Sequence, residues 1–184
     1  MEKWTYGTRV YFLRISLFVA LTVLLSWVSL PFTPPLTLGL FAITLSLYLL
    51  GGASGIITVT VYLAMGAIGL PVFSGFVGGV GHFASATGGY LIGYLLYALT
   101  YAALCRVLGE GNKRRLLYSA AGLIILYASG SVWYAFVYLG GADSYFASLL
   151  VTVVPFIIPD AIKIALAYLV NKRLSKIIKT GENK

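Results

Sequence analysis

Charged residues are scarce in this sequence, and their scarcity decides the class of protein. Asp, Glu, Lys and Arg together make up 10% of the 184 residues, against about a quarter in ordinary soluble domains. None of the four occurs between Ile15 and Cys105, and hydrophobic residues reach 60% of the chain. Because a soluble domain needs far more polar surface than this, the composition predicts an all-α polytopic membrane protein, with residues 1–184 forming a single domain.

Residues that build catalytic and metal sites are also few. Cys105 is the only cysteine and His82 the only histidine, so an internal disulfide is impossible and a metal centre of the usual kind lacks ligands. The chain has five acidic residues, and it contains no P-loop, His-Glu-x-x-His or Gly-x-Ser-x-Gly motif. We therefore expect no enzymatic activity, no metal and no bound cofactor.

Apolar segments predict six membrane-spanning helices. Their approximate ranges are 11–30, 36–50, 56–68, 90–108, 116–139 and 144–170. The second and third are shorter than the roughly 20 residues that cross a bilayer as a helix. A long Gly-rich loop, residues 69–89, separates the third segment from the fourth.

The basic residues predict how these spans are oriented. The net charge is +8, and 12 of the 13 basic residues fall in three short segments, residues 3–14, 106–115 and 172–184. Excess Lys and Arg mark the cytoplasmic side of a membrane protein. The two termini and the 109–115 loop are therefore expected in the cytoplasm, and the Gly-rich loop on the outer side. These clusters do not form the basic and aromatic stripe of a nucleic-acid binder, so we expect no nucleic-acid partner.

Asp160 and Lys163 are the exceptions, because they lie inside the last apolar segment. A charged side chain at bilayer depth costs at least about 2.5 to 3.5 kcal/mol, so such residues usually have a partner or a function. Their i, i+3 spacing places both on one face of a helix. This pattern favours a polar clamp that faces a ligand, while an ion pair that only fixes helix packing remains the alternative.

The Gly-rich loop is too long for a simple connection and too apolar for an ordinary solvent loop. Irregular backbone at membrane depth survives only where it is buried or lines a cavity. Gly75 and Gly79 allow a close approach to a ligand, so the loop is interpreted as half of a binding pocket or, alternatively, as a flexible loop. His82, within it, is either a hydrogen-bonded loop residue or a ligand partner. On the first span, Ser16 and Ala20 form a small-x-x-x-small step that lets another helix approach.

Several motifs in this chain resemble those of the BioY family, the biotin-specific substrate-binding (S) components of energy-coupling factor (ECF) transporters. The resemblance extends in order over nearly the whole sequence. The motifs that carry it are Pro31-Phe32-Thr33-Pro34, Gly69-Leu70-Pro71-Val72-Phe73, Thr87-Gly88-Gly89-Tyr90-Leu91-Ile92-Gly93 and Pro155-Phe156-x-x-Pro159-Asp160-x-x-Lys163.

The resemblance implies a six-helix S component in a prokaryotic cytoplasmic membrane, with both termini in the cytoplasm and a pocket for biotin near the outer face. Uptake would be completed with a transmembrane T component and two ATPases. The resemblance places Asp160 and Lys163 on the ligand and Ser16 and Ala20 against the T component. The other residues expected to bind the ligand are Thr37, Phe73, Gly75, Gly79, His82, Tyr90 and Trp133.

Two other functions remain open from the sequence. One is an S component for another vitamin, and the other is a membrane scaffold in which Asp160 and Lys163 merely lock helices together. For a biotin ligand, the carboxylate needs hydrogen-bond donors, and the expected outer loops contain no Lys or Arg. We therefore expect neutral donors along Gly75–Thr87 to hold it.

Overall fold

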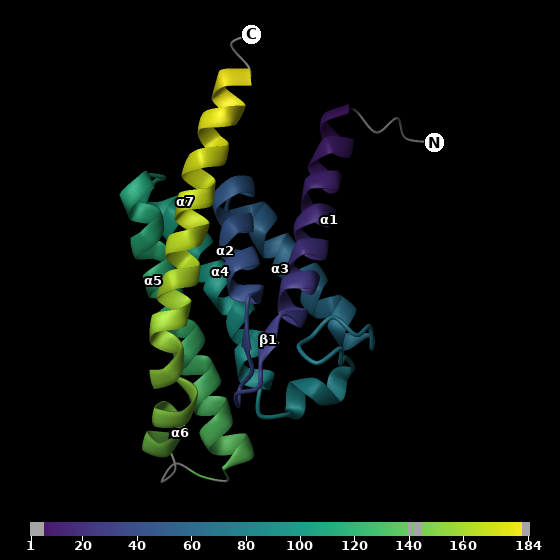
Figure 1. Ribbon diagram of the computed structural model, residues 1–184, viewed down its shortest axis with the longest axis vertical. Helices are drawn as coiled ribbons and strands as arrows, with labels where there is room; N and C mark the ends of the chain where they lie inside the picture. The colour runs from purple at the N-terminus through teal and green to yellow at the C-terminus, as the bar shows by residue number, and fades with distance from the viewer. Residues whose placement is uncertain (1–5, 140, 142–144, 182–184) are drawn as a thin grey trace.

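The structure, a computed structural model, describes residues 6–139, 141 and 145–181. The outermost basic residues, Lys3 and Lys184, lie outside the described residues, as does Ser144, where the sixth expected span begins. The described part is a helical bundle that surrounds a small hairpin at one end (Figure 1).

Six helical segments make up the bundle, as the sequence predicted. The first five are α1 (Tyr6–Trp27), α2 (Gly39–Leu50), α3 (Gly52–Ala67), α4 (Gly88–Leu108) and α5 (Asn112–Trp133), the last of which continues as the π-helical turn η2 (Tyr134–Tyr138). The sixth consists of α6 (Tyr145–Thr152), the 3-10 turn η4 (Val154–Phe156) and α7 (Ile157–Gly181). It breaks at Pro155, where the missing N–H and the proline ring disfavour a continuous α-helix.

Four segments are long and apolar enough to cross a membrane: Gly7–Trp27, Gly88–Leu108, Asn112–Tyr138 and Tyr145–Ser175. The two others, α2 and α3, are shorter, with 12 and 16 residues. Gly51 alone joins them, with a φ of +85° that an L residue would rarely adopt. The helix α2 lies in the middle of the bundle (Figure 1), and nine of its 12 residues are buried. Its hydrophobicity on all sides is typical of a fully buried helix.

A short antiparallel hairpin, which the sequence analysis did not predict, precedes α2. Strand β1 (Ser29–Leu30) pairs with β2 (Leu36–Thr37), so that Ser29 faces Thr37 and Leu30 faces Leu36. The segment expected to be helical from residue 36 therefore becomes helical only at Gly39. The hairpin turns over the end of the bundle that also carries the Gly-rich loop and the short helix η1 (Val80–Ala84) (Figure 1).

Both described ends of the chain, at Tyr6 and Gly181, lie at the opposite end of the bundle (Figure 1). The basic 109–115 turn between α4 and α5 shares that side, which is cytoplasmic. The hairpin and the Gly-rich loop accordingly form the outer end. Inside the bundle, buried tyrosines are hydrogen-bonded across helices: Tyr97 to Thr44 at 2.8 Å and Tyr48 to Ser119 at 2.7 Å. These hydrogen bonds supply partners for polar groups, which lipid could not provide.

Candidate ligand-binding site

A cavity lies just beneath the hairpin, enclosed by α2, α4, α5 and α7. It comprises about 380 Å³ of empty space, counted out to open solvent. Its lining residues are Pro34, Pro35, Leu36, Thr37, Leu40, Tyr90, Tyr94, Leu126, Tyr127, Phe156, Asp160 and Lys163.

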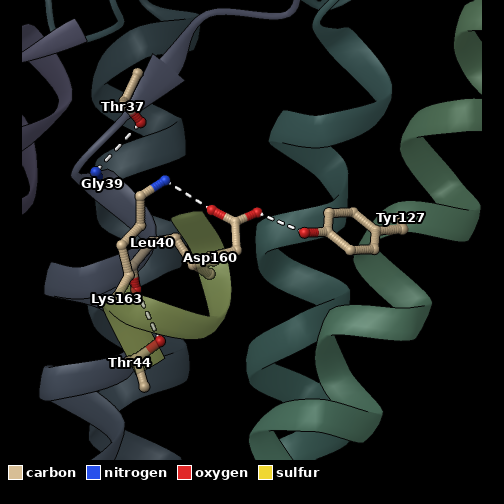
Figure 2. A network of polar contacts seen from close by, with 7 residues as sticks. All are labelled: Thr37, Gly39, Leu40, Thr44, Tyr127, Asp160 and Lys163. Atoms are coloured by element: carbon tan, nitrogen blue, oxygen red, sulfur yellow. Dashed lines mark hydrogen bonds and ion pairs between the residues drawn. The ribbon is translucent and has the colours of Figure 1, made fainter. Parts of the chain in front are cut away.

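Asp160 and Lys163 form an ion pair within this lining. Lys163 Nζ lies 2.7 Å from Asp160 Oδ1, and the two residues are only 6% and 5% exposed. Tyr127, from α5, donates a hydrogen bond to the other carboxylate oxygen, Oδ2, at 2.8 Å. Figure 2 shows the lysine and the tyrosine converging on the carboxylate from two directions. A carboxylate with a fixed orientation next to an ammonium group presents an acceptor and a donor to the same ligand.

The first turn of α7 explains how this pair reaches the cavity. Pro155 interrupts the sixth segment, and α7 then begins at Ile157, so Asp160 lies in its first turn. A negative charge near a helix N-terminus interacts favourably with the helix dipole. Lys163 follows three residues later on the same face. Both side chains therefore point to the bundle interior, and an ion pair that lines a cavity can do more than lock helices together.

A second cavity adjoins the first beneath the Gly-rich loop. It also comprises about 380 Å³ to its open side, and it shares Pro34, Pro35, Thr37, Tyr90 and Tyr94 with the first. Its remaining lining residues are Ser26, Tyr62, Phe73, Ser74, His82, Thr87 and Leu91. The two cavities together form an elongated site with the charged pair at one end and neutral polar groups at the other.

The Gly-rich loop is held against α3 by a close contact between Gly66 and Phe73. A Cβ atom at Gly66 would fall 1.9 Å from Phe73 Cζ, so the aromatic ring fits only because residue 66 is glycine. Phe73 is almost fully buried, and the Gly79 N–H donates to the Gly66 carbonyl at 2.7 Å. Phe73 and the backbone around Gly79 thus form a packed wall of the second cavity.

His82 stacks on the Phe73 ring, with ring centroids 5.4 Å apart, and its Nε2 lies 3.2 Å from Thr87 Oγ1. Burial lowers the pKa of this imidazole below its ordinary value, because a low-dielectric environment disfavours the cation. At neutral pH the site therefore has a neutral histidine at its outer end. His82 is a hydrogen-bonded loop residue that also lines the second cavity, and its contact with a ligand stays a prediction.

The structure brings most, but not all, of the expected ligand-binding residues to these cavities. Thr37 and Tyr90 line both, while their polar atoms also bond within the protein: Thr37 Oγ1 accepts from the Gly39 N–H at 3.2 Å, and the Tyr90 hydroxyl donates to the Thr152 carbonyl at 2.8 Å. Gly75 and Gly79 lie in the loop, each with a positive φ, and line neither cavity.

Trp133 also lies outside both linings. Its indole N–H donates to the Ser85 carbonyl at 3.0 Å and so ties the end of the loop to α5. Five tyrosine and proline residues that line the cavities were not predicted from the sequence: Pro34, Pro35, Tyr62, Tyr94 and Tyr127. With 14 tyrosines in the chain, no spacing distinguished Tyr94 or Tyr127 from the tyrosines of the core, whereas Pro34 belonged to a motif that had already been noted.

Comparison with known proteins then places the chain in a family. A sequence model of the BioY family matches residues 2–180. The chain belongs to the BioY family. A probable biotin transporter BioY of Pyrococcus horikoshii is 38% identical over 161 residues, which cover 87% of this chain and 93% of that protein. The biotin transporter BioY of Thermotoga maritima is 37% identical over 166 residues, or 90% of this chain and 95% of that protein.

The fold has a counterpart among solved structures. The crystal structure, at 2.1 Å, of the S-component for biotin from an ECF-type ABC transporter superimposes with a TM-score of 0.80 at 26% identity, and 95% of each chain is covered. The six-helix S-component fold expected from the sequence is thereby confirmed. Together with the four apolar spans, family membership establishes a multi-pass protein of the prokaryotic cell membrane.

Proposed function

We propose that this protein is the biotin-binding S component of an ECF transporter and captures the vitamin at the outer face of the membrane. The single observation that carries the proposal is the buried pair of Asp160 and Lys163, 2.7 Å apart, in the wall of a cavity lined largely by tyrosine, leucine and proline. The fold and family, whose named members are biotin transporters, support it.

The chemistry of biotin matches both ends of this elongated site. The ureido ring offers two N–H donors and one carbonyl acceptor, which suit a carboxylate and an ammonium group side by side. The Lys163 ammonium group has three N–H donors, and within the described residues one of them bonds to Asp160. Another donor can therefore reach the ureido carbonyl. The fused apolar rings and the aliphatic tail suit the aromatic and proline walls.

The small residues of α1 offer a surface for a partner protein. Ser16 and Ala20 are exposed on α1, on the side that does not face the bundle, where small residues allow another helix to pack closely. We propose this surface as the contact for a transmembrane T component, with two ATPases supplying the energy of uptake. No cofactor is proposed, because the chemical work of this chain is binding alone.

Calorimetric titration tests this function. The detergent-purified protein is titrated with biotin and then, in separate experiments, with thiamine and riboflavin. High-affinity binding of biotin alone is the expected result. Binding of another vitamin in its place would assign the same fold to a different substrate. Absence of binding by any of them, from protein that melts cooperatively, would favour a scaffold in which the ion pair is structural.

A further inference from the structure

A separate hollow lies at the cytoplasmic end of the bundle, between α1 and the Gly51 turn that joins α2 to α3. It comprises about 840 Å³, counted to its open side. Its lining residues are Gly7, Val10, Tyr11, Arg14, Ile15, Leu49, Leu50 and Ser54. None of them lines the cavities of the vitamin site.

The short lengths of α2 and α3 create this hollow. At about 1.5 Å of rise per residue, helices of 12 and 16 residues extend about 18 and 24 Å, whereas the 22 residues of α1 extend about 33 Å. Figure 1 shows α1 and α7 continuing past the end of α2. The turn between α2 and α3 therefore ends short of the cytoplasmic ends of α1 and α7.

The first turn of α3 faces this hollow with groups that attract anions. The helix begins after Gly51, and no side chain caps its N-terminus. The backbone N–H groups of the first helical residues have no acceptor within a helix, and the aligned peptide dipoles add a partial positive charge at this end. Phosphate groups bind at helix N-termini for these two reasons.

Ser54 supplies a second and independent indication of a ligand. It is only 8% exposed, and it lines the hollow. Among the residues that the structure describes, no hydrogen bond involves its hydroxyl, while its carbonyl accepts from Thr58 Oγ1 at 2.9 Å. Among the described residues no fully buried side-chain polar atom lacks a partner, so this hydroxyl reaches the open hollow and is free to donate to an acceptor that lies there.

Arg14, from α1, completes the polar part of the lining. A guanidinium group binds phosphate oxygens in a bidentate geometry and stays charged at any physiological pH. Apart from Tyr11, which carries a hydroxyl, the rest of the lining is apolar, chiefly Val10, Ile15, Leu49 and Leu50. A hollow with a cation, a helix N-terminus and a free hydroxyl beside aliphatic side chains matches a molecule that is anionic at one end and hydrocarbon at the other.

We propose that this hollow is a binding site for one anionic phospholipid of the inner leaflet. The phosphate lies between the Arg14 guanidinium and the N-terminus of α3, the Ser54 hydroxyl donates to it, and an acyl chain lies along Val10 and Leu50. The site is distinct from the exposed Ser16 and Ala20 surface. Those two residues follow Arg14 on α1 but lie outside the lining of the hollow.

Native mass spectrometry of the delipidated, detergent-solubilised protein tests the proposal. The wild type, Arg14→Gln and Ser54→Ala are titrated with phosphatidylglycerol, and Arg9→Gln serves as the matched control, because Arg9 is an exposed cation of the same helix that does not line the hollow. Loss of a charge-assisted contact is expected to weaken the first bound lipid about tenfold in Arg14→Gln and about threefold in Ser54→Ala. Arg9→Gln should stay within about twofold of the wild type.

Parallel titrations with phosphatidylcholine and with inorganic phosphate separate the other occupants. Neither is expected to bind comparably at the same concentration. Equal binding of phosphatidylcholine, or equal losses in Arg14→Gln and Arg9→Gln, would overturn the proposal in favour of diffuse lipid contact. If millimolar inorganic phosphate saturates the site, the site binds a soluble anion. If the purified T component displaces the lipid one for one, the site belongs to the interface with that protein. Cooperative thermal melting, measured on the same samples, verifies folding and keeps this test independent of the proposed transport function.

Discussion

Tyr127 holds Asp160 in place from a neighbouring helix: its hydroxyl donates to Asp160 Oδ2 at 2.8 Å, while Lys163 occupies Oδ1. Because α5 carries the tyrosine and α7 the carboxylate, the direction of the Asp160 side chain depends on how the two helices pack. Tyr127 therefore acts as a positioning residue, which orients the acceptor that the proposed ligand requires.

Removing that hydroxyl is expected to weaken biotin binding while the protein stays folded. A hydrogen bond to a charged group contributes about 1.5 to 3 kcal/mol, so Tyr127→Phe should lose roughly 10- to 100-fold in affinity by calorimetry. The matched control is Tyr118→Phe, which removes a hydrogen bond to the Gly109 carbonyl from the cytoplasmic end of the same helix. An equal loss of affinity in both variants would show that Tyr127 acts only through general stability.

Replacing Asp160 by asparagine is expected to cost more, because the change also removes the counter-charge of Lys163. Truncating one partner of a buried charged pair costs about 2 to 5 kcal/mol, equivalent to at least about 30-fold in biotin affinity. The double variant Asp160→Asn, Lys163→Met separates the two hypotheses about the pair. It relieves the unpaired buried charge, so stability should recover while biotin binding stays lost. Recovery of binding, or a change of less than about threefold in Asp160→Asn, would identify the pair as a structural lock.

The sequence revealed Asp160 and Lys163 for a physical reason that does not extend to their neighbours. Charges inside an apolar segment are conspicuous because the bilayer penalises them. Tyr127 carries no such mark, since the bundle also buries Tyr62, Tyr97 and Tyr101, and only the packing of α5 against α7 distinguishes it. The hairpin was equally hidden, because strands of two residues have no detectable period.

The role of the Gly-rich loop was predicted only in part from the sequence. Its length and apolarity indicated a buried wall, and the contact of Phe73 with Gly66 and with His82 agrees with that interpretation. Which loop residues reach the cavity could not be read from glycine spacing, because Gly75 and Gly79 shape the backbone while Phe73, Ser74 and His82 provide the lining. Trp133 was expected at the ligand as an aromatic residue, and its bond to the Ser85 carbonyl depends on a tertiary contact that no motif encodes.

Gly66→Ala tests whether that wall must be closely packed. The added methyl group would meet the Phe73 ring at 1.9 Å, so the ring must move into the cavity or the loop must shift. Overpacking of this kind costs about 1 to 3 kcal/mol. We expect a lower melting temperature and a loss of biotin affinity of more than about fivefold. Gly81→Ala is the control, since nothing lies within 4 Å of its Cβ position. Unchanged affinity in Gly66→Ala would mean that Phe73 does not shape the bound state.

Ala20→Phe, and likewise Ser16→Phe, is expected to abolish uptake and to leave biotin binding nearly unchanged. Both residues are exposed on α1, so a phenyl group should fit in the isolated protein but prevent the close approach of another helix. Uptake of labelled biotin by cells, with binding measured on purified protein, checks the separation. Ile124→Phe, a lipid-exposed position on α5, should transport normally. Normal uptake by either α1 variant would remove that residue from the proposed docking surface.

The carboxylate at the end of the biotin tail must be hydrogen-bonded or hydrated when the ligand is bound. No Lys or Arg lies in the described part of the outer loops, and the lowered pKa of His82 keeps its imidazole neutral at neutral pH. Lys163 lies at the other end of the site, beside Asp160. The Gly79 N–H is already bonded to Gly66, and the polar residues that the loop contributes to the outer cavity, Ser74, His82 and Thr87, are all neutral.

With the ureido ring on Asp160 and Lys163, the tail extends towards these neutral groups and ends near water. An exposed carboxylate without a cationic partner gains little from its charge. Biotin methyl ester and biotin amide should therefore bind within about threefold of biotin, and affinity should change little between 50 and 500 mM salt, because screening acts on charge interactions. The Lys163→Met variant should lose affinity for biotin and for the ester to the same extent. A loss of more than about 30-fold on esterification, restricted to proteins that retain Lys163, would place the carboxylate on that lysine and reverse the orientation of the ligand.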